Sequence, residues 1–385
     1  MTQSPIEELT RNAAHVLPKG ALEEKLRLER PLRVKLGIDV TAPDVTLGNG
    51  IPLQRMAAFQ REGHIGVLIV GDYTTRIGDP SGRSAARPIL SDEEIDANAR
   101  RFVDQASTII DPDRTEVRFN GEWLAKLDFA EILRLTRTTT VAQVLERDDF
   151  AKRQLAREPI SMSELLYPLM QAYDSVAVNA DVELGGTDQL YNLLAGREVM
   201  LAYGLEPQVA LTVEYLVSWD GAGMSASRGN YIGLKEDARE QFGKAMRIPD
   251  ELLPQWYRLV LEQDDDPLRG DPLAAKLALA RFIVTRAHGD EAAARAEAHF
   301  TRVVREGRAP DQLAEVSLPI GDPIHLPAAL AEWFGMSTSE ARRLISQGGV
   351  RVDGEPVSEL DLARDTLAGA VVQAGKRRFA RIASD

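Results

Sequence analysis

One face of a predicted helix carries three polar side chains that could hold a small polar ligand. In the stretch YPLMQAYD, Tyr167, Gln171 and Asp174 fall at positions i, i+4 and i+7, which a helix places on the same side. A phenol, an amide and a carboxylate among apolar neighbours suit the binding of amino and hydroxyl groups. An internal polar network that fixes this helix to a sheet is the alternative, and the spacing alone leaves both open.

Two strand ends offer further polar groups. In ELGGTDQ, the glycines at 185–186 permit close approach to the backbone, and Asp188 and Gln189 supply acceptors and donors at an expected strand-to-helix turn. Asp79 follows the buried strand expected at 66–72, on the edge where parallel sheets usually bind ligands. For the segment that contains Asp79, a simple surface turn remains the alternative.

Three segments have features of phosphate binding. A strand ends at Asp39 and a helix begins near Gly48, so free backbone N–H groups point into the loop between them. Arg83 and Arg87 lie four residues apart, at the spacing of one helical face. The stretch at 220–234, DGAGMSASRGNYIGL, has the glycines and serines of a phosphate loop but no lysine and only one arginine. Structural turns with solvated arginines are the competing interpretation.

These groups need a parallel sheet to position them. A strand near Val34–Ile38, a helix over residues 48–63 and a buried strand at 66–72 make a βαβ unit. Similar alternation continues along the chain, which predicts a doubly wound α/β domain at about 30–234. Within it, the Ser-x-x-Glu pattern of LSDEEIDANARR predicts a capped amphipathic helix.

The remainder divides into two smaller parts. From Lys235 to about Gly321 strand signals fade and helical periodicity dominates, which predicts an all-helical domain. Beyond it, SEARRLISQ reads as a helix and VRVDGEPV as a hairpin with an Asp-Gly turn. We therefore expect three domains, at residues 1–234, 235–321 and 322–385.

Composition restricts the class of protein. The 385 residues are 44% hydrophobic and 27% charged, contain no cysteine, and show neither a secretory signal nor a long apolar run, so we expect a cytoplasmic globular protein. The net charge of −13 argues against indiscriminate nucleic-acid binding. The C-terminal stretch GKRRFARI is nevertheless basic, so RNA contact and a solvated strand end both remain open there.

The ordered blocks VKLGIDVTAPDVTLGN, GDYTTRIGDPSGRS, YPLMQAYDSV, DVELGGTDQ and GMSASRGNYIGL resemble bacterial tyrosyl-tRNA synthetases, which are class I synthetases. The similarity covers almost the whole chain, and SEARRLISQGGVRVDGEPV resembles an S4-type RNA-binding domain. The resemblance implies a Rossmann-type catalytic domain, an α-helical domain that contacts tRNA and a small α+β S4-like domain. It also implies a homodimer that activates L-tyrosine with ATP and transfers it to tRNA(Tyr).

The resemblance also assigns roles to individual residues. It implies tyrosine binding by Gly37, Asp39, Asp79, Tyr167, Gln171, Asp174 and Gln189. Asp174 would accept the phenol hydrogen bond, so that phenylalanine would leave a buried polar group unpaired. It implies contact with ATP or the adenylate by Thr41, Gly48, Gly186, Asp188, Gly223, Met224, Ser225, Ala226 and Ser227. ATP is the expected co-substrate, with Mg²⁺ accompanying it and no metal site made by the protein. We expect RNA contacts at Arg342, Arg343, Lys376, Arg377 and Arg378.

The chain departs from the family where ATP should bind. The HIGH-type tetrapeptide is Thr46-Leu47-Gly48-Asn49, without histidine, and the KMSKS-type loop at 223–227 lacks both lysines. Lys35 stands where some members have a tyrosine. Loss of one preorganised donor typically lowers a catalytic rate about 10²–10³-fold, so compensation is needed. The candidates for it are Thr46, Asn49, Arg83, Arg87 and Arg228.

Three hypotheses follow. The first is a tyrosine–tRNA ligase whose activity is reduced. The second is a non-catalytic relative that binds tyrosine or RNA as a sensor. The third is a tyrosine transfer to a different acceptor.

Overall fold

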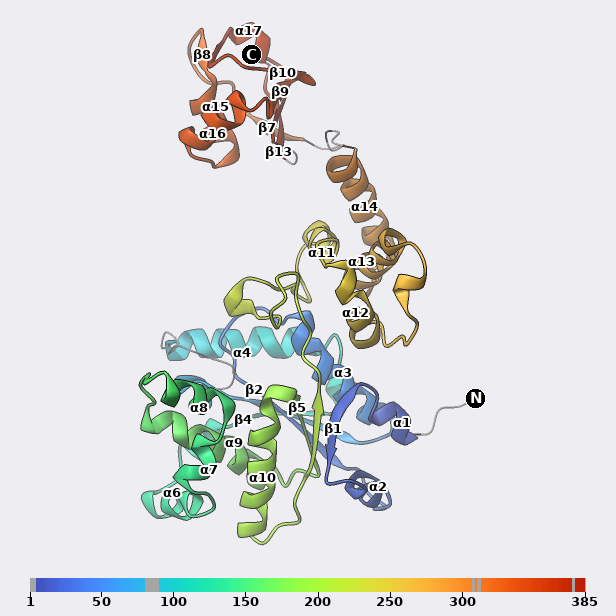
Figure 1. Ribbon diagram of the computed structural model, residues 1–385, viewed down its shortest axis with the longest axis vertical. Coiled ribbons are helices and arrows are strands. Elements are labelled where there is room, and N and C mark those ends of the chain that lie inside the picture. The colour runs from blue at the N-terminus through green and yellow to red at the C-terminus, as the bar shows by residue number, and fades with distance from the viewer. Residues whose placement is uncertain (1–4, 80–89, 307–308, 310–312, 376–377, 385) are drawn as a thin grey trace. The chain divides into compact units, whose positions relative to one another are not determined.

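The computed structural model describes residues 5–79, 90–306, 309, 313–375 and 378–384 (Figure 1). The chain forms two compact units. The first comprises Met1–Glu236 and Arg247–Leu279, and the second comprises Asp237–Met246 and Ala280–Asp385. Since the helices of segment 235–321 are divided between these units, the three-part organisation stays a prediction.

A six-stranded sheet forms the centre of the first unit, in the order β1-β6-β5-β2-β3-β4. Its strands are β1 (Ala13–Leu17), β2 (Arg33–Ile38), β3 (Ile65–Val70), β4 (Thr115–Phe119), β5 (Val182–Gly186) and β6 (Val209–Val213). Strands β2 to β6 pair in parallel, whereas β1 pairs antiparallel with β6 at the edge. The doubly wound α/β fold is confirmed. The sequence did not predict β1, because this half-exposed edge strand has no apolar run.

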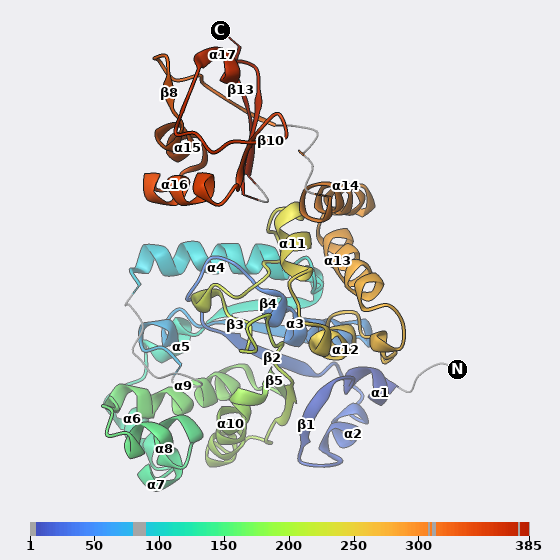
Figure 2. The same cartoon turned by 45° about the horizontal axis from the view of Figure 1, so that its top comes forward.

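Helices cover both faces of this sheet. α3 (Leu47–Arg61) joins β2 to β3, α4 (Asp92–Ala106) joins β3 to β4, and α10 (Leu190–Ala202) joins β5 to β6. The chain moves outward from β2 in one direction and from β5 in the other, so right-handed crossovers put α10 on the face opposite α3 and α4. Figure 2 shows α4 and α10 on opposite sides of the sheet. α9 (Met162–Val178) packs against α10.

Local sequence explains where the main elements begin. β3 is almost entirely apolar and buried, as expected for a central parallel strand. Ser91 and Glu94 form the predicted capping box at the start of α4. Thr46 and Asn49 form another at the start of α3, which fixes the turn that follows β2.

The other helices of the first unit are short. They are α1 (Pro5–Leu9), α2 (Ala21–Leu26), α5 (Gly121–Leu124), α6 (Phe129–Thr136), α7 (Val141–Leu145), α8 (Asp148–Leu155) and α12 (Leu253–Val260). The 3₁₀ turns are η1 (Thr74–Arg76), η2 (Pro112–Arg114), η3 (Thr187–Gln189), η4 (Ala226–Arg228), η5 (Asp250–Leu252) and η6 (Pro267–Arg269). α13 (Pro272–His288) contributes residues to both units. Within the described ranges, no helix is long and apolar enough to cross a membrane.

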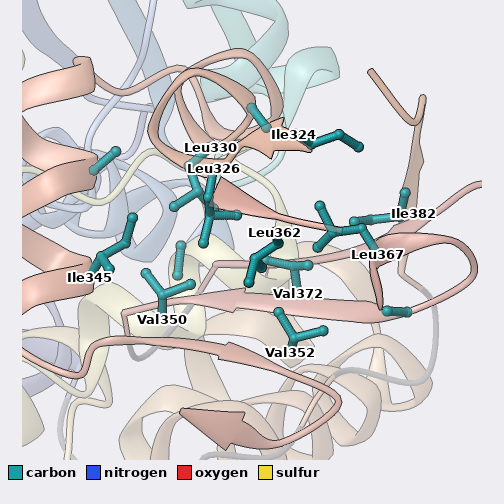
Figure 3. Close-up of a cluster of buried hydrophobic side chains, with 14 of the residues drawn as sticks. Ile324, Leu326, Leu330, Ile345, Val350, Val352, Leu362, Leu367, Val372 and Ile382 are labelled. Carbon is teal, nitrogen blue, oxygen red and sulfur yellow. The ribbon is translucent and has the colours of Figure 1, made fainter. Parts of the chain in front are cut away.

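The second unit contains helices and a small sheet. Its helices are α11 (Ala238–Ala245), α14 (Asp290–Phe300), a π-helix (Thr301–Arg305), α15 (Leu326–Phe334), α16 (Thr338–Ser346) and α17 (Arg364–Leu367). The strands β7 (Ala314–Val316), β9 (Val350–Val352), β10 (Glu355–Pro356), β12 (Val371–Ala374) and β13 (Arg378–Ile382) form one sheet; β8 (Ile324–His325) and β11 (Asp361–Leu362) pair separately. Figure 3 shows the core between helices and sheet, with Leu330, Ile345 and Val372 among its buried residues.

Two details of this unit bear on the sequence predictions. The Asp-Gly hairpin is confirmed: β9 and β10 pair, and Asp353 and Gly354 both have positive φ, as its tight turn requires. β7 lies in the segment where only helices were expected. It pairs in parallel with β13, and a three-residue strand is too short to give a periodic signal.

Candidate active site

A cavity of about 320 Å³ lies at the carboxyl ends of the strands in the first unit. Residues that follow four strands line it, among them Asp39 after β2, Thr74 after β3, Asp188 after β5 and Tyr215 after β6. β2 and β5 are the neighbours at which the strand order reverses. Doubly wound proteins bind their ligands at this position.

Asp174 on α9 is a buried carboxylate in this cavity, only 3% exposed. Its Oδ1 accepts a hydrogen bond from Trp123 Nε1 at 2.8 Å, and its Oδ2 accepts one from Asn120 Nδ2 at 3.3 Å. Burial raises the pKa of Asp174 to about 7, although Lys35 and these two donors lower it. Carboxylate oxygens have further lone pairs, so Asp174 retains capacity to accept a hydrogen bond from a ligand.

Asp39 is oriented from two sides. The Tyr167 hydroxyl donates to its Oδ2 at 3.0 Å, and the Thr74 hydroxyl donates to its Oδ1 at 2.8 Å. Burial, with the nearby carboxylates of Asp39 and Asp79, raises the pKa of Tyr167 well above its usual value. The phenol therefore stays protonated and keeps Asp39 in place at the end of β2.

An amide network joins α9 to α10. Gln171 Nε2 donates to Glu183 Oε1 at 3.1 Å, while Gln171 Oε1 accepts from Asn192 Nδ2 at 3.1 Å. Asn192 Nδ2 also donates to Gln189 Oε1 at 2.9 Å, and Gln189 Nε2 donates to Asp79 Oδ2 at 2.7 Å. Sequence reasoning missed Asn192, because a lone asparagine inside a helix carries no pattern.

A buried ion pair supports this network. Lys35 Nζ donates to Glu183 Oε1 at 2.9 Å, to Ser175 Oγ at 2.7 Å and to the Gln171 carbonyl at 2.9 Å. Both charged side chains are inaccessible to solvent, and Lys35 and Glu183 are register partners on β2 and β5. The sequence analysis noted Lys35 only as a departure and missed Glu183. The available signal was one charged residue in the middle of each of two central strands.

At the start of α3 the altered tetrapeptide caps the helix. Asn49 Oδ1 accepts hydrogen bonds from the backbone N–H and the hydroxyl of Thr46, at 3.0 and 2.9 Å. Both residues line the cavity, as does Gly48. Because the capping box uses the amide oxygen of Asn49, its amide nitrogen is the group suited to donate to a ligand.

The altered loop at 223–227 is held from behind by Asn230. Asn230 is buried, its Oδ1 accepts from Ser225 N at 2.9 Å, and its Nδ2 donates to both Asp220 oxygens at 3.0 Å. Sequence reasoning did not single out Asn230. The loop is thus ordered without lysines, and Arg228 at the end of η4 is exposed and outside the cavity lining.

The described lining residues are strongly acidic. They include Asp39, Asp44, Asp79, Asp174, Asp188 and Glu214, and neither a lysine nor an arginine. Burial and the neighbouring Asp79 raise the pKa of Asp188. Arg83 and Arg87 lie outside the described residues. Glu214 forms an ion pair with Arg258 at 2.9 Å, and a triphosphate would meet the negative charge of the other carboxylates in the described part of this cavity.

Most predicted site residues come together in this one cavity. Its lining includes Gly37, Asp39, Thr41, Thr46, Gly48, Asn49, Asp79, Tyr167, Gln171, Asp174, Gly186, Asp188, Gln189, Met224, Ser225, Ala226 and Ser227. Gly223 and Arg228 do not line it.

The predicted RNA-binding residues lie in the second unit. Arg342 and Arg343 are exposed on α16. Arg378 on β13 forms an ion pair with Glu340 at 3.1 Å. Lys376 and Arg377 lie outside the described residues.

The sheet order, the cavity at its reversal point and the capped helix after β2 are the arrangement of a doubly wound ligand-binding domain. Residues 27–305 match the family model for tRNA synthetases class I (W and Y), and residues 326–361 match the S4 domain. The chain belongs to this family, on the branch of the tyrosine–tRNA ligases.

Similar proteins support the assignment along almost the whole chain. The chain is 47% identical to the tyrosine–tRNA ligase of Moorella thermoacetica, over 97% of this chain and 94% of that protein. It is 43% identical to that of Thermotoga maritima, over 99% and 97%. The tyrosyl-tRNA synthetase of Archaeoglobus fulgidus, solved with L-tyrosine, superposes with a TM-score of 0.63 at 22% identity, over 76% of this chain and 98% of that one, which shows the shared fold.

Proposed function

We propose that this protein is a tyrosine–tRNA ligase: it binds L-tyrosine, activates it with ATP to tyrosyl-adenylate and transfers it to tRNA(Tyr). The observation that carries the proposal is Asp174, a buried carboxylate held by Trp123 and Asn120 beside Tyr167 and Gln171 in the cavity. The names of the relatives, at 43% to 47% identity, agree with it.

The arrangement of polar groups fits a bound tyrosine. The phenol hydroxyl of the ligand donates to Asp174. Its ammonium group lies near Asp79, Tyr167 and Gln171, whose carboxylate, phenol and amide oxygens accept its hydrogen bonds. Gly37, Asp39 and Gln189 border the same space. A carboxylate-rich pocket attracts an ammonium group and gives no gain to a neutral side chain.

ATP binds at the other side of the cavity, in this proposal as its Mg²⁺ complex. Thr41, Gly48, Gly186, Asp188 and the 223–227 loop border that side, with Thr46 and Asn49 at the helix start. The acidic lining makes neutralisation of the triphosphate essential. Mg²⁺ bound with ATP, together with Arg83 and Arg87, would supply the positive charge that the missing lysines would have provided.

ATP–pyrophosphate exchange in the presence of L-tyrosine tests this function. We expect exchange above background, and we expect Arg83→Ala and Arg87→Ala each to reduce its rate about 10²–10³-fold, since each removes a charge-stabilising donor. Arg228→Ala is the matched comparison: its side chain is exposed outside the cavity lining, so we expect a smaller loss.

Two outcomes would change the assignment. Tyrosine binding without any exchange would favour the non-catalytic hypothesis. A loss in Arg228→Ala as large as that in Arg83→Ala would mean that the loop delivers its own arginine to the phosphates.

We expect L-tyrosine binding to strengthen as the pH rises through about 7. In the free protein burial raises the pKa of Asp174 to about 7, so the carboxyl group ionises across that value. A tyrosine hydroxyl donates more strongly to the ionised form because charge-assisted hydrogen bonds are stronger. Calorimetry about one pH unit below and above this pKa should show roughly a tenfold gain in affinity.

Asp174→Asn serves as the control, because its affinity should not follow this titration. Stability of the free protein should change in the opposite direction. A carboxyl group whose pKa is raised in the folded state stabilises the fold at low pH and loses that contribution as the pH rises from 3.8, its ordinary pKa, to about 7. The melting temperature of the native chain relative to Asp174→Asn should therefore fall across this pH range. A tyrosine affinity that is flat across this window would contradict the role of Asp174.

The second unit suits a tRNA-binding role. Its S4-type segment and the exposed Arg342 and Arg343 support RNA contact, together with Arg378 and the adjacent Lys376 and Arg377 in the sequence. We retain the three-domain division at residues 234 and 321, and we infer a cytoplasmic location, where tRNA(Tyr) is charged.

We also infer a homodimer formed through α6 to α9. Phe129, Val141, Leu155 and Met162 lie on these consecutive helices and are 63% to 88% exposed. Several large exposed apolar side chains together are typical of a protein interface.

Light scattering after size exclusion should therefore give a dimer for the native chain. Phe129→Asp and Leu155→Asp should shift it toward the monomer. Leu268→Asp, at an exposed leucine outside these helices, should not. A native chain that elutes as a monomer would refute the dimer.

A further inference from the structure

Tyr215 is an aromatic residue of the cavity that the residues proposed above to bind tyrosine and ATP do not include. It follows β6, lines the cavity and is 54% exposed. A short hairpin begins beside it: Met224 N donates to the Leu216 carbonyl at 2.8 Å, and Val217 and Gly223 form an antiparallel bridge. Tyr215 is therefore next to the loop whose lysines are missing.

The ring of Tyr215 covers Gly223. A Cβ atom at residue 223 would lie 3.1 Å from Tyr215 Cδ2 and 3.4 Å from Cε2. Ordinary contacts between carbon atoms are about 3.5–4.0 Å, so a side chain there and the ring in its present place are mutually unfavourable. Aromatic rings on a neighbouring strand stabilise glycines in this way.

Backbone conformation does not explain the glycine. Gly221 and Gly229 in the same segment have φ of 78° and 69°, which favour glycine, whereas Gly223 has no such positive φ. The close approach of the Tyr215 ring is therefore the explanation for a glycine at position 223. At the position of the first lysine of the KMSKS-type loop, even a Cβ atom would require the ring of Tyr215 to shift by a few tenths of an ångström.

The position of Tyr215 in the cavity indicates what it would contact. The partners of Asp174, Asn120 and Trp123, follow β4 at one end of the sheet order, whereas Tyr215 follows β6 on the other side of β2 and β5. When the ligand L-tyrosine occupies the part of the cavity next to Asp174, the nucleotide is the ligand that remains to occupy the part next to β6. Stacking between an aromatic ring and a base needs no cation, so it suits a cavity whose described lining residues are acidic and include no lysine.

We propose that Tyr215 stacks on the adenine ring of ATP and of the adenylate, and that Gly223 is required because this ring occupies its side-chain space. This rests on the proposed ligase function. Tyr215 and Gly223 act as one unit, which replaces part of the affinity that the loop lysine would supply through the phosphates.

Calorimetric titration with a non-hydrolysable sulfamoyl analogue of tyrosyl-adenylate tests the stacking. Tyr215→Leu should weaken binding of this analogue roughly 10- to 100-fold, the range for loss of a base–aromatic stack, and should leave L-tyrosine affinity unchanged. Tyr215→Phe keeps the ring and should bind both as the native chain does. Unchanged analogue affinity in Tyr215→Leu would overturn the proposal. An equal loss for L-tyrosine would also overturn it, since it would mean that the ring only supports the hairpin.

Gly223→Ala tests the coupling between the two residues. In the native background this substitution should weaken binding of the analogue, because the added Cβ atom displaces the ring. In the Tyr215→Leu background it should have no effect on binding of the analogue. Equal effects in both backgrounds would contradict the coupling. Failure of the native chain to bind the analogue would refute the ligase function itself, whereas tight native binding that Tyr215→Leu retains would refute the stacking alone.

Discussion

Asp174→Ala should weaken L-tyrosine binding by about 2 kcal/mol or more, roughly 30-fold, with little change for L-phenylalanine. The variant removes the buried acceptor of the tyrosine hydroxyl. It also leaves Trp123 Nε1 and Asn120 Nδ2 without the carboxylate to which they donate. A site built to pair a substrate hydroxyl rejects the analogue that lacks it, and tyrosyl-tRNA synthetases are themselves the known example, at roughly 10⁵. Discrimination between the two amino acids should therefore fall by about the same factor as the affinity for L-tyrosine.

Calorimetry with both amino acids measures this effect. Asp44→Ala is the matched control, since Asp44 is a carboxylate of the same cavity that pairs with Tyr231 rather than with the α9 network. Thermal melting verifies that each variant is folded. Unaltered tyrosine affinity in Asp174→Ala, or an equal loss for phenylalanine, would mean that Asp174 does not bind the phenol.

Lys35→Met should destabilise the first unit by about 3–5 kcal/mol, the usual effect of removing one partner of a buried ion pair. Lys35 and Glu183 are inaccessible to solvent, and Lys35 Nζ also donates to Ser175 and to the Gln171 carbonyl. Without it, the Glu183 carboxylate stays buried with no positive partner at that distance. Gln171 loses part of its support, so tyrosine affinity should fall as well.

Chemical denaturation measures this loss of stability, and two further variants serve as controls for the buried charges. Lys235→Met removes the same side chain from an exposed pair with Asp104, and such pairs contribute about 0–1 kcal/mol. Lys35→Met combined with Glu183→Gln removes both charges and should recover much of the stability. If Lys35→Met costs no more than Lys235→Met, the buried pair is not a determinant of stability.

The sequence by itself determined the doubly wound α/β arrangement and those elements whose residues form a local pattern. The strand at β2, the capped start of α4 and the turn at Asp353 and Gly354 all depend on residues within a few positions of one another, so local patterns were sufficient. The stretch YPLMQAYD also placed Tyr167, Gln171 and Asp174 on one side of a helix, because a helical face can be read from spacing alone. β7 was not predicted, because three residues are too few to show a periodic pattern.

Only the tertiary structure decided what these residues contact. Trp123 and Asn120, the partners of Asp174, lie 51 and 54 residues before it, and Glu183 lies 148 residues after Lys35. The ring of Tyr215 over Gly223 is likewise invisible in spacing, because a hairpin sets the distance between them. Sheet register and side-chain packing fix such pairings, and burial then sets their energies. No local pattern contains that information, since it depends on which distant strands become neighbours.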